Sequence, residues 1–524
     1  MLFPTVSFAV FFAVVLPASW LLMPHRTWWK LFLIAASWFF YGCAGWGFVP
    51  LLAASTVVNH FLAFNIDRAE GPARRWWTMA AVAANLAGLG WFKYVGFLST
   101  STTSLLDHMG LGIHLPLPKV LLPAGISFFT FQAISYVVDV SRRKLHPVGL
   151  LDFAVYLSFF PHLLAGPIVR ASEFLPQIRH RVDPRRVEAS RALWLISRGL
   201  FKKVVIASYM STHADALFGV PAQHAGVEAL FGVYAYAIQI YADFSGYTDI
   251  AIGLALLLGV RFPQNFDSPY RSLSLQEFWR RWHMTLSRFL RDYLYIPLGG
   301  NRRGTRRTYL NLMATMLLGG LWHGAAWTFV AWGGLHGAGL AVERARLWHR
   351  SRALLARAAV GGAAPGAAGP PAAPAAVDST TPDAIGSTAA AEPGATSGSA
   401  LVTATRRAPT VGGRRIRRVL AWAVTFHVVC LGWVFFRATS FANAGQVLGR
   451  LFAGGRHVHL DVMVVAVVAC SLAVQWFPAR WSTGLQRTFV RWSIPAQALA
   501  LAGGLVVIDA FGPAGVAPFI YFRF

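Results

Sequence analysis

The sequence predicts an all-α polytopic membrane protein with about 11–12 transmembrane helices, accompanied by re-entrant and amphipathic helices. Three observations support this class. Of the 524 residues, 56% are hydrophobic and only 13% are charged. The charged residues gather between apolar runs of roughly 17–25 residues, the length that crosses a bilayer as a helix. The 20 Trp and 39 Phe fit a lipid-facing body with aromatic residues at both interfaces. This composition excludes an ordinary soluble enzyme.

The formal net charge of +26 does not indicate a nucleic-acid partner. The Lys and Arg residues lie in short loops between apolar runs, where the positive-inside bias and anionic membrane lipid account for them. No zinc-finger or aromatic single-strand-binding pattern accompanies them. Cys43, Cys430 and Cys470 form no CxxC pair, and the sequence has no HExxH motif or His/Cys cluster. We therefore expect neither a disulfide framework nor a metal site.

The apolar runs give a topology when they are read in order. The first run has no basic n-region and no small-residue cleavage site, so we expect an uncleaved first span. Basic loops occur after every second span, and the positive-inside rule places them in the cytoplasm. The N-terminus is then expected outside. The loop 99–118 carries no Lys or Arg and is expected outside. The expected spans are 1–23, 30–48, 49–65, 76–98, 119–140, 190–218, 227–260, 416–436, 459–477 and 493–511.

Two further runs, 150–169 and 309–342, have basic clusters on both sides. The chain must therefore enter and return on the cytoplasmic side. The first run contains prolines and a glycine, which are tolerated in a re-entrant hairpin only where protein surrounds them. The second run divides into two legs of roughly 17 residues, which leaves His323 near the deepest point. Glycines on both sides of His323 permit close helix approach, and whether the legs fully span stays open.

The run 227–260 carries a polar patch with Asp243 and Asp249 in its interior. Charged groups at that depth indicate either a broken helix that lines a cavity or a helix packed wholly inside the bundle.

The domain organisation follows from composition. We expect one core made of residues 1–357 and 414–524, the second part contributing C-terminal transmembrane helices and a tail. Residues 358–413 between them are rich in Ala, Gly and Pro without hydrophobic periodicity, so we expect a disordered cytoplasmic linker.

Two histidines are candidate catalytic residues. His323 is suited to general-base chemistry because imidazole exchanges a proton near neutral pH. The alternative is a packed histidine bonded to a backbone carbonyl. His283 lies four residues from both Trp279 and Ser287, which predicts one stripe of an amphipathic helix that also suits a membrane interface. His336 lies roughly 220° around a continuous helix from His323, so we interpret it as structural.

Arginines near His283 form a candidate phosphate site. Arg280, Arg281, Arg288 and Arg291 suit the phosphates of coenzyme A or of a phosphopantetheine carrier. They suit lipid phosphates equally well, and the sequence leaves both readings open.

Seven motifs together resemble the membrane-bound O-acyltransferase superfamily, in particular the bacterial branch with the alginate O-acetylation and teichoic-acid D-alanylation membrane proteins. The motifs are Leu122–Gln132, Gln239–Asp249, Asn265–Tyr270, Phe278–His283, Arg291–Gly300, Leu321–Gly324 and Phe519–Phe522. They extend from about residue 120 to the C-terminus. The linker 358–413 is an insertion relative to that branch.

The resemblance implies many helices around a central funnel or tunnel that joins the two sides of the bacterial cytoplasmic (inner) membrane. It implies that His323 is the catalytic histidine and His283 the second active-site histidine. Four motif residues are then supporting residues: Trp322, Trp282, Asp243 and Asn265. It also implies a cytoplasmic acyl donor, commonly acetyl-CoA, and an extracytoplasmic glycan acceptor often served by a separate SGNH-type partner. No bound cofactor is expected.

The combined hypothesis is a membrane O-acyltransferase that moves an acyl group, expected to be acetyl, from a cytoplasmic thioester to hydroxyls of an envelope or exported polysaccharide. The donor is acetyl-CoA or an acyl-carrier thioester, and Arg280, Arg281 and Arg291 are its candidate binding residues. An alternative is a transporter or flippase for an envelope precursor that uses Asp243 and Asp249. A third is a scaffold without catalysis.

The C-terminal tail holds one further candidate. Tyr521 is the only hydroxyl-bearing residue in its aromatic segment. A phenol beside a general base is a competent nucleophile, so we consider Tyr521 an acyl shuttle. The alternative is an interfacial anchor, a common role of Tyr in membrane proteins.

Overall fold

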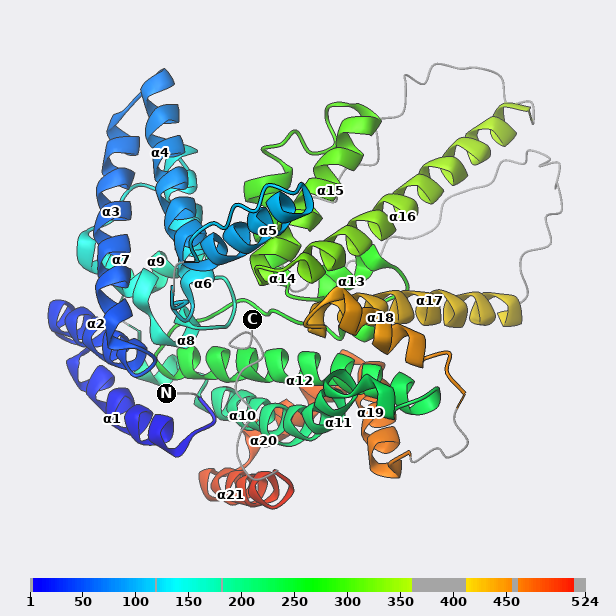
Figure 1. Cartoon of the computed structure of the whole chain (residues 1–524). Helices are drawn as coiled ribbons and strands as arrows, with labels where there is room; N and C mark the ends of the chain where they lie inside the picture. Colours follow the sequence, from blue (N-terminus) through cyan, green and yellow to red (C-terminus); the bar gives the residue numbers. More distant parts are fainter. Residues whose placement is uncertain (1–2, 118–119, 181, 361–410, 455–459, 513–524) are drawn as a thin grey trace, which may run out of the picture. The chain divides into compact units, whose positions relative to one another are not determined.

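The computed structural model describes residues 3–117, 120–180, 182–360, 411–454 and 460–512 (Figure 1). Within these ranges the regular structure is helical and no strand occurs. The chain divides into two compact units, one of Met1–Glu343 with Ala421–Phe524 and one of Arg344–Leu420. The candidate site lies in the first unit. The greater part of the expected linker (361–410) and the tail 513–524 with Tyr521 lie outside the described residues.

The N-terminal part forms helices close to the expected spans. They are α1 (Val6–Leu22), α2 (Arg26–Gly42), α3 (Val49–Arg68), α4 (Gly71–Leu89), α5 (Val95–His108) and α6 (Ile126–Ser141). One expectation is wrong, because residues 99–108 are helical rather than loop. A π-turn at Gly90–Tyr94 joins α4 to α5, so helical structure continues past residue 98. The polar side chains there are compatible with a helix; the hydroxyl of Thr100, for example, donates to the carbonyl oxygen of Gly96 at 2.9 Å.

The run 150–169 is broken, as its prolines require. It forms α7 (Leu150–Ser158) and the short α8 (Phe160–Leu163), and α9 (Ala171–Arg179) follows. Every residue from 153 to 169 is buried. Protein therefore surrounds this irregular backbone, which satisfies the condition under which a proline-containing segment is tolerated at membrane depth.

The polar patch of the run 227–260 lies on a helix packed inside the bundle, the second of the two expected alternatives. The helix α12 (Val227–Leu257) is continuous and mostly buried, and in Figure 1 it runs beside α10 (Ala189–Leu200) and α11 (Ser208–Gly219). Its Asp243 is 2.5 Å from the amine of Lys203, with side chains only 4% and 2% exposed.

Asp249 accepts from Arg198 at 2.7 Å and from Lys202 at 2.8 Å. Both acids of the patch are thus held by cations of the neighbouring helical segment, because a buried charge is tolerated only when it is paired.

The motif around His283 is not one amphipathic helix, so that expectation is wrong. The chain forms α13 (Leu275–Arg281), then breaks at Trp282 and His283, and continues as α14 (Met284–Leu290). His283 has φ of 42°, in the left-handed region that no helix continues through. The proposed stripe of residues four apart therefore does not exist.

The run 309–342 forms the expected pair of legs. They are α15 (Gly304–His323) and α16 (Trp327–Val360), and His323 is the last residue before the turn. A Cβ on Gly320 would lie 2.3 Å from the carbonyl oxygen of Phe329, and one on Gly333 would lie 2.3 Å from that of Met316. The glycines therefore permit the close backbone approach that the sequence predicted.

In residues 411–454 and 460–512, three helices lie at expected spans and two others were not expected from the sequence. The expected ones are α17 (Val411–Arg437), α19 (Val462–Val474) and α21 (Ile494–Phe511). The others are α18 (Phe441–Arg450) and α20 (Ala479–Arg491), which mix apolar and charged residues and are too polar to appear as spans.

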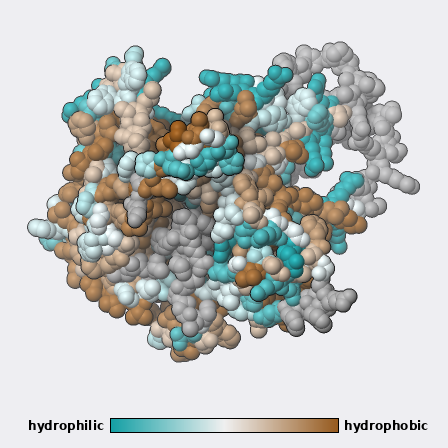
Figure 2. Space-filling model, in the orientation of Figure 1, coloured by the Kyte–Doolittle hydropathy of each residue, from teal (hydrophilic) through white to brown (hydrophobic). Residues whose placement is uncertain are grey.

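Within the described ranges, four helical segments are long and apolar enough to cross a membrane: Trp46–Arg68, Gly71–His108, Arg415–Arg437 and Ile494–Phe511. Shorter apolar helices are Val6–Leu22, Ile126–Ser141 and Val462–Val474. Many large hydrophobic side chains are exposed, and Figure 2 shows hydrophobic residues over parts of the visible face, beside hydrophilic ones. Exposed apolar side chains of this kind suit contact with lipid. The all-α polytopic class is confirmed, whereas the number of about 11–12 spans and the central funnel stay predictions.

Candidate functional site

His283 is fully buried at the break between α13 and α14. A left-handed conformation costs a residue with a side chain roughly 1–2 kcal/mol, and neighbouring hydrogen bonds stabilise it here. The N–H of Met284 donates to the carbonyl oxygen of Asn265 at 2.9 Å, and the N–H of Ser287 donates to that of His283 at 3.0 Å. The motif therefore folds to place one imidazole ring inside the protein.

The side chain of Asn265 determines which nitrogen of His283 carries the proton. Its Oδ1 accepts the backbone N–H of Thr285 at 3.2 Å, and a backbone N–H can only donate. The same oxygen lies 3.1 Å from Nδ1 of His283, so Nδ1 must be the protonated nitrogen of the neutral ring. Nε2 then presents a lone pair, and it has no hydrogen-bond partner among the described residues.

A second contact connects this arrangement to the broken run 150–169. The hydroxyl of Thr285 donates to Oδ1 of Asn265 at 2.9 Å and accepts the N–H of Ile168 at 3.0 Å. The irregular backbone before Ile168 thus supports the residue that orients His283. The sequence reading treated these motifs separately, and the structure brings them together.

His323 lies at the C-terminal end of α15 with only 4% of its surface exposed. Its ring centroid is 4.9 Å from that of Trp322, 5.0 Å from Trp332 and 5.2 Å from Phe436. The Trp322 ring is also 6.3 Å from the ring of His283. The two predicted catalytic histidines, 40 positions apart in the sequence, therefore contact the same indole.

Trp282, predicted as a supporting residue, packs near His283 through Phe266. It is buried, and its ring lies 5.1 Å from that of Phe266, which in turn faces the ring of His283 at 6.4 Å. Asp243, the remaining predicted supporting residue, is held by Lys203 as described above.

His336 lies closer to His323 than the sequence suggested. The ring of Trp332 is 5.0 Å from the rings of both histidines. The angle of about 220° between His323 and His336 holds only for one continuous helix. The chain instead turns between α15 and α16, so the angle does not apply. His336 is fully buried.

Lys93 is a residue of this region that the sequence reading missed. Its amine donates to the carbonyl oxygens of Trp322 and His323 and lies 3.4 Å from the hydroxyl of Ser127. A signal was present, because a lysine within an expected span is costly in hydrocarbon and marks a functional or paired position. The adjacent Tyr94 donates its hydroxyl to the carbonyl oxygen of Leu321 at 2.9 Å.

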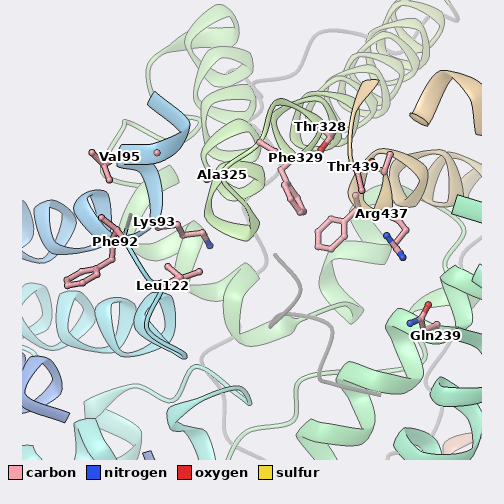
Figure 3. A pocket seen from close by; sticks show the side chains of 15 residues that line it. Phe92, Lys93, Val95, Leu122, Gln239, Ala325, Thr328, Phe329, Arg437 and Thr439 are labelled. Carbon is pink, nitrogen blue, oxygen red and sulfur yellow. The ribbon is translucent and has the colours of Figure 1, made fainter. Parts of the chain in front are cut away.

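A cavity of about 460 Å³ shares the side chain of Phe436 with the surroundings of His323. Lys93 borders it, as do Phe329, Phe436 and Arg437, and Phe436 also touches the His323 ring. Figure 3 shows Lys93 on one side of the cavity and Arg437 with Gln239 on the other. The cavity therefore combines an aromatic wall with cationic and amide groups, a composition suited to a polar ligand.

The three predicted donor-binding arginines differ in their surroundings. Arg281 is bound by two acids, Asp267 at 2.6 Å and Glu277 at 3.0 Å. Arg280 is exposed and makes no ion pair within the described part of the chain. Among the three, Arg280 is the one whose charge is available to a ligand.

Arg291 contacts Asp292 at 2.7 Å, and Arg170 contacts the same carboxylate at 2.6 Å. Burial raises the pKa of Asp292, but the hydrogen bonds and charges of Arg291 and Arg170 outweigh it and hold that pKa below its ordinary value. Asp292 is therefore ionised at neutral pH and neutralises part of this basic region.

Comparison with known proteins identifies the family. A model of the membrane-bound O-acyltransferase family matches residues 120–357. The chain is 45% identical to a probable alginate O-acetylase of Azotobacter vinelandii over 320 residues, 60% of this chain and 63% of that protein. It is 35% identical to the corresponding protein of Pseudomonas aeruginosa over 503 residues, 93% of this chain and 82% of that protein.

A peptidoglycan O-acetyltransferase of Helicobacter pylori is 36% identical over 449 residues, 80% of this chain and 73% of that protein. The match to the Azotobacter vinelandii protein spans less than two thirds of its length, whereas the other two matches extend further. The fold, the motifs and these relatives agree: the chain is a multi-pass membrane protein and belongs to the membrane-bound O-acyltransferase family.

Proposed function

We propose that this protein is an O-acetyltransferase that transfers an acetyl group from a cytoplasmic thioester to hydroxyls of an extracytoplasmic polysaccharide or envelope glycan. The observation that carries the proposal is the pair of buried histidines, His283 and His323, packed against Trp322 in a member of an O-acyltransferase family. Relatives named as alginate and peptidoglycan O-acetylating proteins support acetyl as the group and a glycan as the acceptor.

His323 acts as the general base in the proposed reaction. Its imidazole takes the proton of the accepting hydroxyl while the oxygen attacks the thioester carbonyl. The new C–O bond forms, the C–S bond breaks, and the thiolate that leaves takes up the proton. His283 assists: in the tautomer held by Asn265 its Nε2 carries the lone pair, and this nitrogen accepts a hydrogen bond from the hydroxyl and orients it.

The donor and partner assignments complete the proposal. The donor is acetyl-CoA or an acyl-carrier thioester, and the exposed Arg280 binds its phosphate from the cytoplasm. The protein resides in the bacterial cytoplasmic membrane. An SGNH-type extracytoplasmic protein receives the group or passes it to the glycan.

The alternative of a transporter is not supported by a specific observation. It required Asp243 and Asp249 as coupling groups. Their buried ion pairs with Lys203, Arg198 and Lys202 support a structural role in the packing of α12 instead.

The test uses washed membranes that contain the protein, incubated with labelled acetyl-CoA or labelled acetyl-carrier. Wild-type membranes should transfer label to envelope glycan. The variant His323→Ala should lose transfer while its expression and insertion stay near normal, because alanine suits a helix and lipid. An exposed histidine, as in His146→Ala, is the matched control. A His323→Ala variant that keeps most of the transfer would remove this residue from the mechanism.

A further inference from the structure

We propose that Lys93 and its neighbour Tyr94 form a cap that holds the C-terminal end of α15, and that Lys93 is thereby a positioning residue for His323. The inference rests on the proposed function for its catalytic consequence, and on geometry alone for the cap. Three consecutive carbonyl oxygens, those of residues 321–323, accept hydrogen bonds from these two side chains.

The end of α15 needs such a partner. The last carbonyl groups of a helix have no intrahelical donor, and they carry the negative end of the helix dipole. Gly324 follows with an extended backbone (φ −155°), so α15 ends at His323 without a further helical turn. A cation that donates to these oxygens satisfies both the hydrogen-bonding and the electrostatic requirement.

The charge of Lys93 has no carboxylate partner in the described part of the chain; its amine contacts the two carbonyl oxygens and the Ser127 hydroxyl, and lies 6.0 Å from the Trp322 ring centroid. A lysine in this membrane segment is costly unless it is partnered. The carbonyl oxygens at the negative end of the α15 dipole therefore stabilise the Lys93 amine, and the interaction is specific to this helix end.

The cap comes from an irregular segment. Lys93 and Tyr94 are the last two residues of the π-turn Gly90–Tyr94 between α4 and α5. A π-turn shifts the register of the side chains that follow, and such turns occur often at functional sites. Here both side chains are directed at the same helix end, as Figure 3 shows for Lys93 at the cavity wall.

The consequence concerns His323. Its own carbonyl oxygen is one of the three acceptors, so the cap fixes the backbone from which the imidazole projects. General-base catalysis depends on sub-ångström placement of the base. Loss of the cap should let the end of α15 fray and move the ring, whereas Arg280, the residue proposed to bind the donor, is not part of the cap.

Three variants of the purified full-length protein test this: Lys93→Met, Lys93→Arg and Tyr94→Phe. Met keeps the apolar stem and removes the charged donor, whereas Arg keeps a cationic donor. We expect Lys93→Met to lower kcat by about 10- to 100-fold, the size that corresponds to losing hydrogen bonds from a charged donor. KM for the donor should change by less than about twofold. Lys93→Arg should recover most of kcat, and Tyr94→Phe should cost less than Lys93→Met.

The matched control is Lys30→Met, which removes the ion pair between Lys30 of α2 and Asp152. It should affect stability but not kcat. An unchanged kcat in Lys93→Met, a defect confined to KM, or failure of Arg to rescue would overturn the positioning role.

Hydrogen–deuterium exchange separates this inference from the proposed reaction. Peptides that cover residues 317–325 should exchange faster in Lys93→Met than in wild type, and the Lys30→Met control should leave them unchanged. Unchanged exchange at this helix end would refute the cap itself. Faster exchange in a protein that transfers no acetyl group would retain the cap and reject the proposed function.

Discussion

Nδ1 of His283 lies 3.1 Å from Oδ1 of Asn265, an oxygen that also accepts the backbone N–H of Thr285. The two contacts together fix the amide orientation and the imidazole tautomer. Nε2 of His283 is left as a buried acceptor. Asn265 therefore orients the ring of His283 and selects its tautomer.

We predict that Asn265→Ala lowers kcat of acetyl transfer by about 10- to 100-fold, because the ring of His283 loses the acceptor that selects its tautomer. Steady-state kinetics of the purified variant measure this. The matched control is Asn311→Ala, another buried asparagine, which donates to the carbonyl oxygen of Gly300 at 2.9 Å. Asn311 lies 12 residues before His323 on α15, about 18 Å away along the helix. Equal losses of kcat in both variants would indicate general destabilisation.

The arginines Arg280 and Arg281 should respond differently to substitution. Arg280 makes no ion pair within the described residues, so Arg280→Ala should raise KM for the donor and leave kcat close to wild type. Arg281 bridges Asp267 and Glu277, so Arg281→Ala should lower the thermal stability in detergent by an amount equivalent to about 1 kcal/mol. Each variant is the control for the other. A kcat defect in Arg280→Ala that saturating donor does not relieve would place this arginine in the chemistry or the structure.

The helix pair α15 and α16 should not tolerate a methyl group at its closest approach. In Gly320→Ala the new Cβ would meet the carbonyl oxygen of Phe329, which cannot move away as a side chain can. We expect a loss of about 1–3 kcal/mol in stability, measured as a lower unfolding temperature in detergent. In Gly504→Ala of α21 nothing lies within 4 Å of the new Cβ. That control should be neutral or slightly stabilising, since alanine favours helix.

Tyr521→Phe tests the proposed acyl shuttle. The substitution keeps the aromatic ring but removes the nucleophilic oxygen. A shuttle requires that glycan acetylation in membranes is lost while donor binding is unchanged. Acetylation at the wild-type rate would assign the tail the alternative role of an interfacial anchor.

The sequence by itself determined the membrane class and the position of most helices, and it singled out His283 and His323 as the histidines to test. Apolar runs of spanning length predict membrane helices directly, because every residue of such a run adds to the favourable free energy of transfer from water into lipid. The pair of legs around His323 was predictable for a similar reason, since basic clusters on both sides of one run require the chain to return. The glycines of this run indicated close helix packing before any contact was known.

Only the tertiary structure decided how the site is assembled. The stripe predicted through His283 failed because one left-handed residue interrupts the helix. Asn265, outside the local pattern, stabilises that conformation by accepting the backbone N–H of Thr285. Lys93 is 230 positions before His323, and no periodicity connects a side chain to a backbone carbonyl that far along the chain. Hydrogen bonds of this kind depend on which helix ends meet in space. Local sequence encodes the helices and their burial, and the packing of the helices selects the partners.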